Sequence, residues 1–436
     1  MKIASVECLP VHSGWRKNFV FVRVATDAGV VGWGEAYSQY DRDRAVAAQV
    51  EELGRYLVGH DPFHIRHILQ IAFDDYAQRR GSLEFYCATS GIELALWDIV
   101  GKATQQPVYN LLGGPCRSRI RVYANGWSYK MQLPEDYARG AEAVLKRGFT
   151  ALKFDPIPGP WRTYIPKDHI RRAVKVTRAV RDAVGPEADI LIEVHRRLAP
   201  MHAIDLANAL AEFEPYWFEE PCQSENVEAL AEVRHASRIP VVTGEALLTR
   251  AGFRPVIRTR AVDIINPDVS NCGGILELMF VAAAAESEAI AVSPHNYNST
   301  TMALSATVHA SACMPNFIIT EYFLPFEELG QRLCPNVLRP VDGYIALPDG
   351  PGLGLNVDEK AVRAAKGKRF PARTFRSLTD EGPIAGRRIV AAIFQGQTPA
   401  GPCDWPLAGR GNFGQPSERE VVTDRAMEAW YHPSIA

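Results

Sequence analysis

The stretch DILIEVH, residues 189–195, is an apolar run of strand length that ends in the ionisable residues Glu193 and His195. Similar runs follow it and close on Glu219, Glu245, Asp268, His295 and Glu321. Successive ends from Glu193 onward lie 23 to 27 residues apart. This is room for one strand, one helix and two short loops, so the pattern predicts a β/α barrel. The carboxyl ends of the strands of such a barrel share one mouth, where we expect these residues to meet.

The composition is that of an ordinary globular protein of 436 residues, with 47% hydrophobic and 22% charged residues. The formal net charge of −2 provides no basic field for nucleic acid or an anionic membrane. Residues 1–15 lack the apolar region of a signal peptide, and residues 281–292 are too short for a membrane span. The eight cysteines form no CxxC pair. We therefore expect a cytoplasmic protein with free thiols and with neither nucleic acid nor a membrane as partner.

Changes in the pattern divide the chain into four predicted parts. Apolar runs around a turn signal at residues 26–29 predict antiparallel strands, and helical patterns follow to about residue 112. The region from about Lys366 onward lacks clear periodicity, so an ordered arm on a neighbouring subunit and a partly disordered tail both fit it. The predicted parts are an α+β domain (1–115), a barrel domain (116–343), a segment that returns to the first domain (344–365) and a C-terminal arm of unknown role (366–436).

A metal site is predicted at Glu193, Glu219 and Glu245, which end three successive strands of the pattern. Adjacent barrel strands lie about 4.8 Å apart, so the three carboxylates can meet on one ion. Oxygen ligands without cysteine favour Mg²⁺ or Mn²⁺ over zinc. Salt bridges to arginines are the alternative for any single glutamate, but equal spacing of three favours the metal. Glu220 is the competing ligand, and we expect it to point to the other face of its strand.

Proton-transfer groups are predicted at the next two strand ends, Asp268 and His295. A carboxylate beside an imidazole fixes its tautomer and stabilises its charged form, as a general base requires. His195 lies two residues after Glu193 and so points to the same side. An acid for a departing hydroxyl group, a hydrogen-bond donor to the substrate and a packing residue are the open alternatives for it.

The predicted strand FTALKFD, residues 149–155, carries Lys153 and Asp155. The alternatives for Lys153 are a base, a cation for a substrate carboxylate and a residue of the barrel core. Asp155 either binds substrate or holds Lys153, and Glu321 either donates to an enolic oxygen when protonated or pairs with a cation. Two loops supply candidate substrate contacts, because loops over a barrel mouth carry binding residues. These are Trp161, Arg162 and Tyr164 from an insertion at 157–169, and Trp15, Arg16 and Asn18 from the N-terminal loop.

Several motifs occur together in the order and spacing of one known family. They are GWGEA (32–36), ALWDIVGKATQQPVYNLLGG (95–114), ALKFDP (151–156), WFEEP (217–221), VTGE (242–245), INPDVSNCGG (265–274) and SPHN (293–296). From Lys2 to about Asp358 the chain therefore resembles the enolase superfamily, specifically the mandelate racemase subgroup and its acid-sugar dehydratases. The resemblance implies an α/β fold in which an N-terminal α+β capping domain covers a (β/α)7β TIM-like barrel, here with a C-terminal extension.

The resemblance also implies a reaction. One Mg²⁺ per subunit, for which Mn²⁺ can substitute, would be held by Glu193, Glu219 and Glu245. The Asp268–His295 dyad would remove the proton α to the carboxylate of a small-molecule acid sugar. Loss of the β-hydroxyl group from the enediolate then gives a 2-keto-3-deoxy acid, as in an aldonate dehydratase, a lyase. Family members further imply a homo-oligomer.

Three features depart from the family pattern. The first ligand is Glu193 where the family often has Asp, the pair Lys153 and Asp155 replaces Lys-x-Lys, and the arm beyond about Lys366 has no counterpart. The incomplete lysine pair favours dehydration over racemisation. The remaining alternatives are an epimerase or racemase, a sugar-lactone cycloisomerase, a Schiff-base aldolase that uses Lys153, and a non-catalytic barrel that binds a ligand.

Overall fold

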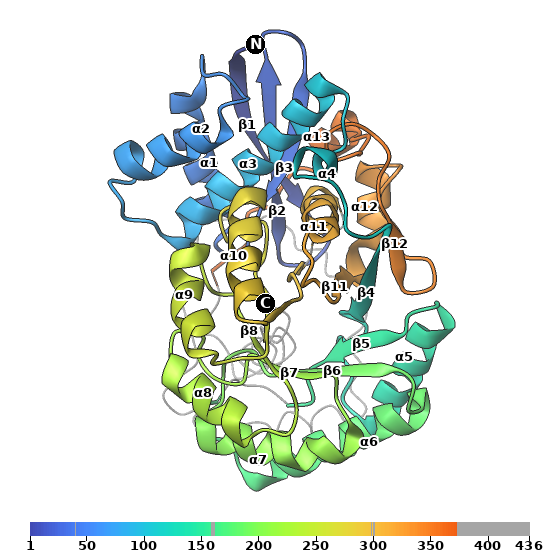
Figure 1. The fold of residues 1–436 in the computed structure, drawn as a ribbon. Coiled ribbons are helices and arrows are strands. Elements are labelled where there is room, and N and C mark those ends of the chain that lie inside the picture. Colours follow the sequence, from blue (N-terminus) through green and yellow to red (C-terminus); the bar gives the residue numbers. More distant parts are fainter. Residues whose placement is uncertain (40, 158–161, 298, 300, 373–436) are drawn as a thin grey trace, which may run out of the picture. The chain divides into compact units, whose positions relative to one another are not determined.

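A sheet of parallel strands lies at the centre of the part between residues 119 and 323 (Figure 1). Its strands are β4 Arg119–Asn125, β5 Ala151–Phe154, β6 Asp189–Glu193, β7 Trp217–Glu219, β8 Val241–Thr243, β9 Ile264–Ile265, β10 Ala291–Val292 and β11 Thr320–Phe323. The computed structural model describes residues 1–372 apart from 40, 158–161, 298 and 300. Within them the hydrogen-bonded order is β10, β9, β8, β7, β6, β5, β4, β11. The N–H of Ile318 donates to the carbonyl oxygen of Val292 at 3.0 Å, which joins the two ends of this order.

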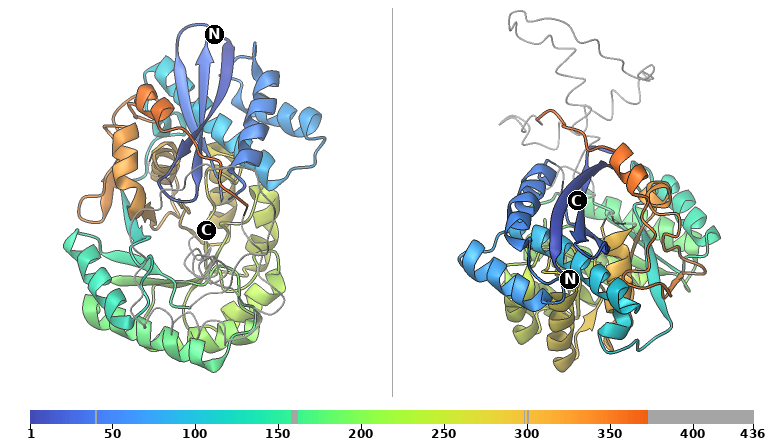
Figure 2. Two further views of the ribbon diagram at one scale, coloured as in Figure 1. Left: turned by 180° about the vertical axis from the view of Figure 1, so that it is seen from behind. Right: turned by 90° about the horizontal axis from the view of Figure 1, so that it is seen from above.

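A helix follows each strand from β4 to β10, and α5 to α10 lie on the outer side of the sheet (Figures 1 and 2). The helices are α5 Pro134–Lys146, α6 Lys167–Val184, α7 Pro200–Leu210 with the 3-10 turn η2 Ala211–Phe213, α8 Val227–Ala236, α9 Thr249–Thr259, α10 Ile275–Ser287 and α11 Met302–Ala312. The predicted (β/α)7β barrel is confirmed.

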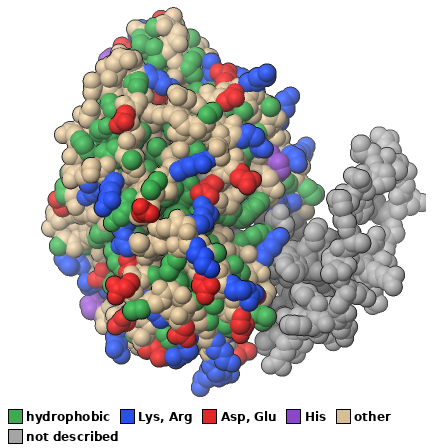
Figure 3. Space-filling view, turned by 90° about the vertical axis from the view of Figure 1, so that its right-hand side faces the viewer, with side chains coloured by type: hydrophobic (Ala, Val, Ile, Leu, Met, Phe, Trp, Pro, Cys, Tyr) green, Lys and Arg blue, Asp and Glu red, His purple; other side chains and the backbone are tan. Residues whose placement is uncertain are grey.

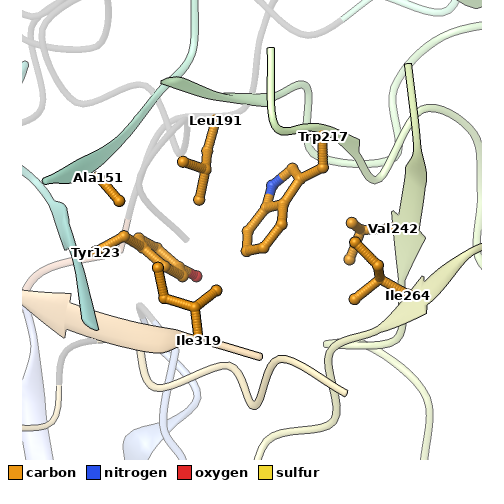
Figure 4. Close-up of a cluster of buried hydrophobic side chains, with 7 residues drawn as sticks. All are labelled: Tyr123, Ala151, Leu191, Trp217, Val242, Ile264 and Ile319. Atoms are coloured by element: carbon orange, nitrogen blue, oxygen red, sulfur yellow. The ribbon is translucent and has the colours of Figure 1, made fainter. Parts of the chain in front are cut away.

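Buried apolar side chains fill the inside of the barrel (Figure 4). They are Tyr123, Ala151, Leu191, Trp217, Val242, Ile264 and Ile319. Alternate residues of a strand point to the same face. Glu193 therefore follows Leu191, and Glu219 follows Trp217, on the inner side and nearer the carboxyl ends of the strands. The apolar layer lies directly beneath the ionisable residues.

The N-terminal part combines an antiparallel sheet with helices. Its elements are β1 Ile3–His12, β2 Asn18–Thr26, β3 Val31–Ala36, α1 Asp43–Leu57, α2 Ile65–Ile71, the π-helix η1 Ala72–Tyr76, α3 Leu83–Thr104 and α4 Val108–Leu111. The predicted turn joins β2 to β3, where Thr26 Oγ1 accepts from the N–H of Val30 at 3.1 Å. Helix α3 packs closely on β3, because a Cβ atom at Gly34 would lie 1.9 Å from the carbonyl oxygen of Gly91. The α+β capping domain is confirmed.

The chain after the barrel contacts both parts. It forms η3 Leu324–Phe326, α12 Glu327–Leu333, β12 Tyr344–Ala346 and α13 Glu359–Ala364. Strand β12 pairs antiparallel with β4 of the barrel, with Ile345 opposite Ile120. The chain returns to the capping domain only after β12, where the carbonyl oxygen of Gly352 accepts from the N–H of Val108 at 3.0 Å. The domain boundaries stay predictions, and residues 373–436 of the predicted arm lie outside the described residues.

The surface drawn in Figure 3 mixes both signs of charge. Lys and Arg side chains are interspersed with Asp and Glu over that face, without a region of one sign. Among the described residues, no helix is both long enough and apolar enough to cross a bilayer.

Candidate active site

Three glutamates from neighbouring strands form a buried carboxylate cluster. Glu193 ends β6 and Glu219 ends β7, and the two residues are partners in the parallel pairing. Glu245 follows β8, and one carboxylate oxygen from each residue lies within 4.8 Å of the others. Burial, together with the charge of Glu193, raises the pKa of Glu219 well above its ordinary value, and the charge of Lys153 opposes this rise. This donor set suits a divalent cation that prefers oxygen, such as Mg²⁺.

Lys153 on β5 places a buried ammonium group beside the cluster. Its Nζ lies 2.8 Å from Glu219 Oε1, 3.4 Å from Glu193 Oε2 and 3.7 Å from Glu321 Oε1. Burial lowers the pKa of Lys153, but the charges of Glu219 and Glu321 outweigh burial and raise it well above the ordinary value. Lys153 is therefore held as a cation, which opposes a Schiff-base role because that chemistry needs the neutral amine.

The adjacent residues Glu219 and Glu220 have different hydrogen-bond partners and point to different places. Glu219 accepts from Trp217 Nε1 and from Asn266 Nδ2, each at 2.9 Å, and is thereby aimed at the cluster. Glu220 accepts from the hydroxyl group of Thr243 at 2.8 Å. It does not belong to the group of described carboxylates that can share an ion.

The loop after β6 brings a guanidinium group against the cluster. Arg196 Nη1 contacts Glu245 Oε1 and lies 3.4 Å from Glu220 Oε2. His195 and Arg196 have φ angles of 52° and 59°, a left-handed conformation that costs about 1–2 kcal/mol for a residue with a side chain. Arg196 was not predicted from the sequence, because glycine or asparagine normally signals such a backbone.

Asp268 and His295 form a buried hydrogen-bonded pair after β9 and β10. Asp268 Oδ2 lies 2.7 Å from His295 Nδ1, and Asp268 Oδ1 accepts from the N–H of Ser270 at 2.8 Å and from its hydroxyl group. His295 Nε2 lies 3.0 Å from Glu245 Oε2 and 3.5 Å from Glu321 Oε2. Burial lowers the pKa of His295, but the charges of Glu245 and Glu321 raise it well above the ordinary value. One imidazole nitrogen is thus bonded to Asp268, and the other faces the cluster.

His195 belongs to a second imidazole–carboxylate pair. Its Nδ1 lies 3.1 Å from Asp155 Oδ2, and its backbone N–H donates to Glu193 Oε1 at 2.6 Å. Arg197 also donates to Asp155 Oδ2. Burial raises the pKa of Asp155, but Arg197 and His195 bring it below its ordinary value. The structure therefore pairs Asp155 with His195 and Arg197 rather than with Lys153.

Glu321 on β11 is held as a carboxylate. It accepts from Asn125 Nδ2 and, at 3.0 Å, from the N–H of Asn296. Burial raises its pKa, but Lys153 and His295 outweigh burial and bring it below the ordinary value. Pairing with a cation is the alternative that this environment favours.

The N-terminal loop reaches the barrel mouth through Trp15. Its ring stacks on Tyr129, which follows β4, at a centroid distance of 4.6 Å, and meets Phe323 on β11 at 6.0 Å. Arg16 and Asn18 are directed to other partners, since Arg16 pairs with Asp41 at 2.8 Å. Asn18 Nδ2 donates to the carbonyl oxygen at residue 368 at 2.7 Å.

Lys17 is a neighbour of the Asp268–His295 dyad that was not predicted from the sequence. Its Nζ lies 4.8 Å from the ring centroid of Tyr297 and 5.7 Å from that of Tyr37. These two rings lie 6.1 and 6.4 Å from the ring of His295. Burial lowers the pKa of Lys17 to about 7, against the opposing charge of Glu35. No sequence signal shows which polar residue of this loop turns inward.

The insertion after β5 is described only in part. Trp161 lies outside the described residues, and Arg162 is half-buried. Tyr164 is 70% exposed, with its ring 6.1 Å from that of His202. The structure therefore does not bring Tyr164 to the carboxylate cluster.

Comparison with known proteins identifies the family. The model for the "Mandelate racemase / muconate lactonizing enzyme, N-terminal domain" matches residues 6–113, and that for the "Enolase C-terminal domain-like" region matches residues 136–361. The chain therefore belongs to the mandelate racemase / muconate lactonizing enzyme family, within the enolase superfamily.

Several named proteins of this family are similar to the chain over most of its length. A D-gluconate dehydratase from Thermoproteus tenax is 35% identical over 354 residues, which are 80% of this chain and 70% of the relative. A D-gluconate/D-galactonate dehydratase from Picrophilus torridus is 33% identical over 80% of this chain and 89% of its own. The solved structure of a mandelate racemase/muconate lactonizing enzyme from a Sulfitobacter species is 34% identical, with a TM-score of 0.79, and covers 85% of this chain and 96% of its own.

Proposed function

We propose that this chain is a Mg²⁺-dependent lyase that dehydrates an acid sugar, specifically an aldonate, to a 2-keto-3-deoxy acid. The observation that carries the proposal is the position of His295, whose Nε2 lies 3.0 Å from Glu245 Oε2 while Nδ1 is bonded to Asp268. A base in this position works on a substrate held at the carboxylate cluster. The names of the gluconate and galactonate dehydratases among the relatives support an aldonate as substrate.

Glu193, Glu219 and Glu245 would hold the Mg²⁺ ion, for which Mn²⁺ is a substitute. Bound there, the ion stabilises the negative charge that develops on the substrate carboxylate as the α-proton leaves. Lys153 contributes a fixed positive charge at the same place, since its Nζ lies 2.8 Å from Glu219. A cation that is already in position needs no rearrangement when the charge forms.

His295 is the proposed base. The base form would be the neutral imidazole, in which Nδ1–H donates to Asp268 and Nε2 carries the lone pair that accepts the α-proton. Nε2 lies 3.0 Å from Glu245 Oε2, whose charge favours the imidazolium, and a cation bound at the cluster would offset that charge. The Asp268 carboxylate then stabilises the imidazolium, and Ser270 fixes the orientation of that carboxylate through two donors. The product of this step is an enediolate, which loses its β-hydroxyl group.

His195 is the proposed acid for the departing hydroxyl group. Asp155 and Arg197 orient it, because Asp155 Oδ2 contacts both its Nδ1 and the guanidinium group. Glu321 is proposed to position Lys153, which lies 3.7 Å away. Of the remaining predicted contacts, Trp15 lies at the barrel mouth and is the first candidate to cover the substrate.

The wider setting of the enzyme is also proposed. The cysteines of the described residues are free thiols, which supports the cytoplasm as its compartment. A homo-oligomeric assembly stays part of the proposal, as do Trp161, Arg162, Tyr164, Arg16 and Asn18 as residues around the substrate.

A screen of acid sugars with Mg²⁺ tests the proposal. Formation of a 2-keto-3-deoxy acid is read with semicarbazide, and His295→Asn is run alongside the wild type. A product that the wild type forms and His295→Asn does not is the expected result. If α-protons exchange with D₂O without loss of water, the activity is that of an epimerase or cycloisomerase and dehydration is wrong.

A further inference from the structure

A buried glutamate of the capping domain contacts the loop that follows His295. Glu35 lies on β3, and its Oε2 accepts from the Ser299 hydroxyl group at 2.7 Å and from the N–H of Ala303 at 3.2 Å. Ala303 lies in the first turn of α11, which begins seven residues after His295. The Ser299 hydroxyl group also accepts from the N–H of Leu304 at 3.1 Å. A capping-domain carboxylate therefore takes the place of an N-cap for this barrel helix.

A second capping-domain glutamate caps the barrel helix that follows the Asp268 loop. Glu93 lies on α3, and its carboxylate accepts from the N–H of Ile275 at 2.8 Å and of Leu276 at 3.0 Å. These residues open α10, which begins seven residues after Asp268. The contact is close, because a Cβ atom at Gly274 would lie 2.3 Å from Glu93 Oε2.

The two glutamates belong to one rigid piece of the capping domain. Strand β3 and helix α3 pack with their backbones in near contact at Gly34 and Gly91. A further backbone bond joins this piece to the dyad, since the N–H of Tyr37 donates to the carbonyl oxygen of Ser270 at 3.0 Å. Ser270 is the residue that fixes the Asp268 carboxylate.

We propose that Glu35 and Glu93 are positioning residues for catalysis, which hold the His295 and Asp268 loops in register from the capping domain. Neither residue contacts the carboxylate cluster through a described hydrogen bond or ion pair, so their effect passes through the backbone of the two loops. A carboxylate at a helix N-terminus is favoured by the helix dipole as well as by the unpaired N–H groups. The proposal rests on the proposed role of the dyad as the base.

Displacement of the two loops is expected to lower kcat more than it weakens substrate binding. Displacement of a catalytic group by about 1 Å lowers kcat by about 100-fold. We therefore expect Glu35→Ala and Glu93→Ala each to lower kcat by about 10- to 100-fold while KM and Mn²⁺ affinity stay unchanged. Glu35→Gln and Glu93→Gln keep an acceptor oxygen for the same N–H groups and are expected to retain most of the rate.

The matched control is Asp98→Ala. Asp98 is a buried capping-domain carboxylate on α3 that accepts from the N–H groups of Trp33 and Leu353, each at 2.9 Å, and makes no described hydrogen bond to either loop. It is expected to lower the melting temperature without lowering kcat. An equal loss of kcat in Asp98→Ala and Glu35→Ala would overturn the proposal, since the effect would then be general destabilisation.

A second readout needs no substrate. The His295 Nδ1–H proton, bonded to Asp268 at 2.7 Å, is expected to give a downfield proton NMR signal that His295→Asn removes. Glu35→Ala should shift or broaden this signal, and Glu35→Gln should keep it. An unchanged signal and kcat in Glu35→Ala would overturn the proposal. If Glu35→Ala does not fold, Ser299→Ala replaces it, because that change removes only the linking hydroxyl group. Dehydration that persists in His295→Asn would instead refute the proposed role of His295 as the base, and the signal would still decide the positioning role.

Discussion

Replacement of Asp268 by asparagine tests how the base is prepared. Asp268 Oδ1 is fixed by two donors from Ser270, the N–H at 2.8 Å and the hydroxyl group. In Asp268→Asn the amide oxygen must take that place, because an amide NH₂ group cannot accept from the N–H. The NH₂ group then faces His295 Nδ1, where Oδ2 now lies 2.7 Å away. The imidazole must carry its proton on Nε2, so it cannot accept the α-proton.

The expected loss is large. The wrong tautomer in an Asp–His pair lowers kcat by about 10⁴-fold, which corresponds to about 5 kcal/mol of transition-state stabilisation. We expect a loss of about 10³- to 10⁴-fold for Asp268→Asn in both dehydration and α-proton exchange in D₂O. Asp268→Ala is the control, because alanine leaves either tautomer open, and it should keep more activity than Asp268→Asn. An asparagine variant within about tenfold of the wild type would refute the tautomer argument.

Three further predictions concern the metal, Lys153 and His309. Mg²⁺ should raise the free energy of unfolding by about 2.7 kcal/mol at 100 times Kd, because it relieves the repulsion in the carboxylate cluster. The melting temperature rises with it, which calorimetry with and without EDTA measures, and Glu219→Gln should abolish the rise. Borohydride with substrate should leave Lys153 unmodified, since its ammonium group is held protonated; an adduct there would restore the aldolase hypothesis. Burial lowers the pKa of His309 from 6.5 to about 4. Between these values the unfolded chain binds a proton that the folded chain does not, so stability present above pH 6.5 falls by about 3 kcal/mol as the pH drops to 4. His309→Asn, which keeps an acceptor for the N–H of Tyr109 now 3.2 Å from Nδ1, should remove this part of the pH dependence in denaturant titrations; an unchanged slope would contradict the assignment.

The strand ends were the predictable part of the molecule. Barrel strands are buried on both faces, so they appear in the sequence as apolar runs, and their spacing indicates the β/α repeat. Strict alternation along a strand then determines which residue faces inward, as for Lys153 on β5 and Glu219 on β7. The neighbouring positions of Asp268 and His295 follow from the order of the strands.

The loops were not predictable by the same argument. Trp15 faces the barrel, whereas Arg16 turns away to pair with Asp41, which lies 25 residues further along the chain. Arg196 reaches the cluster through a left-handed backbone that no glycine signals. Such choices depend on tertiary contacts, which local periodicity does not record. Residues 344–346 likewise pair with β4 before the chain returns to the capping domain, because a short apolar run does not specify its partner strand.

The fate of the α-hydrogen tests the central claim most directly. An acid sugar found in the screen is deuterated at C2, and the release of deuterium to solvent is followed together with the 2-keto-3-deoxy product for the wild type and His295→Asn. We predict that the wild type releases label as product forms, and that His295→Asn neither releases label nor forms product. Release and product formation by His295→Asn at the wild-type rate would contradict the assignment of His295 as the base.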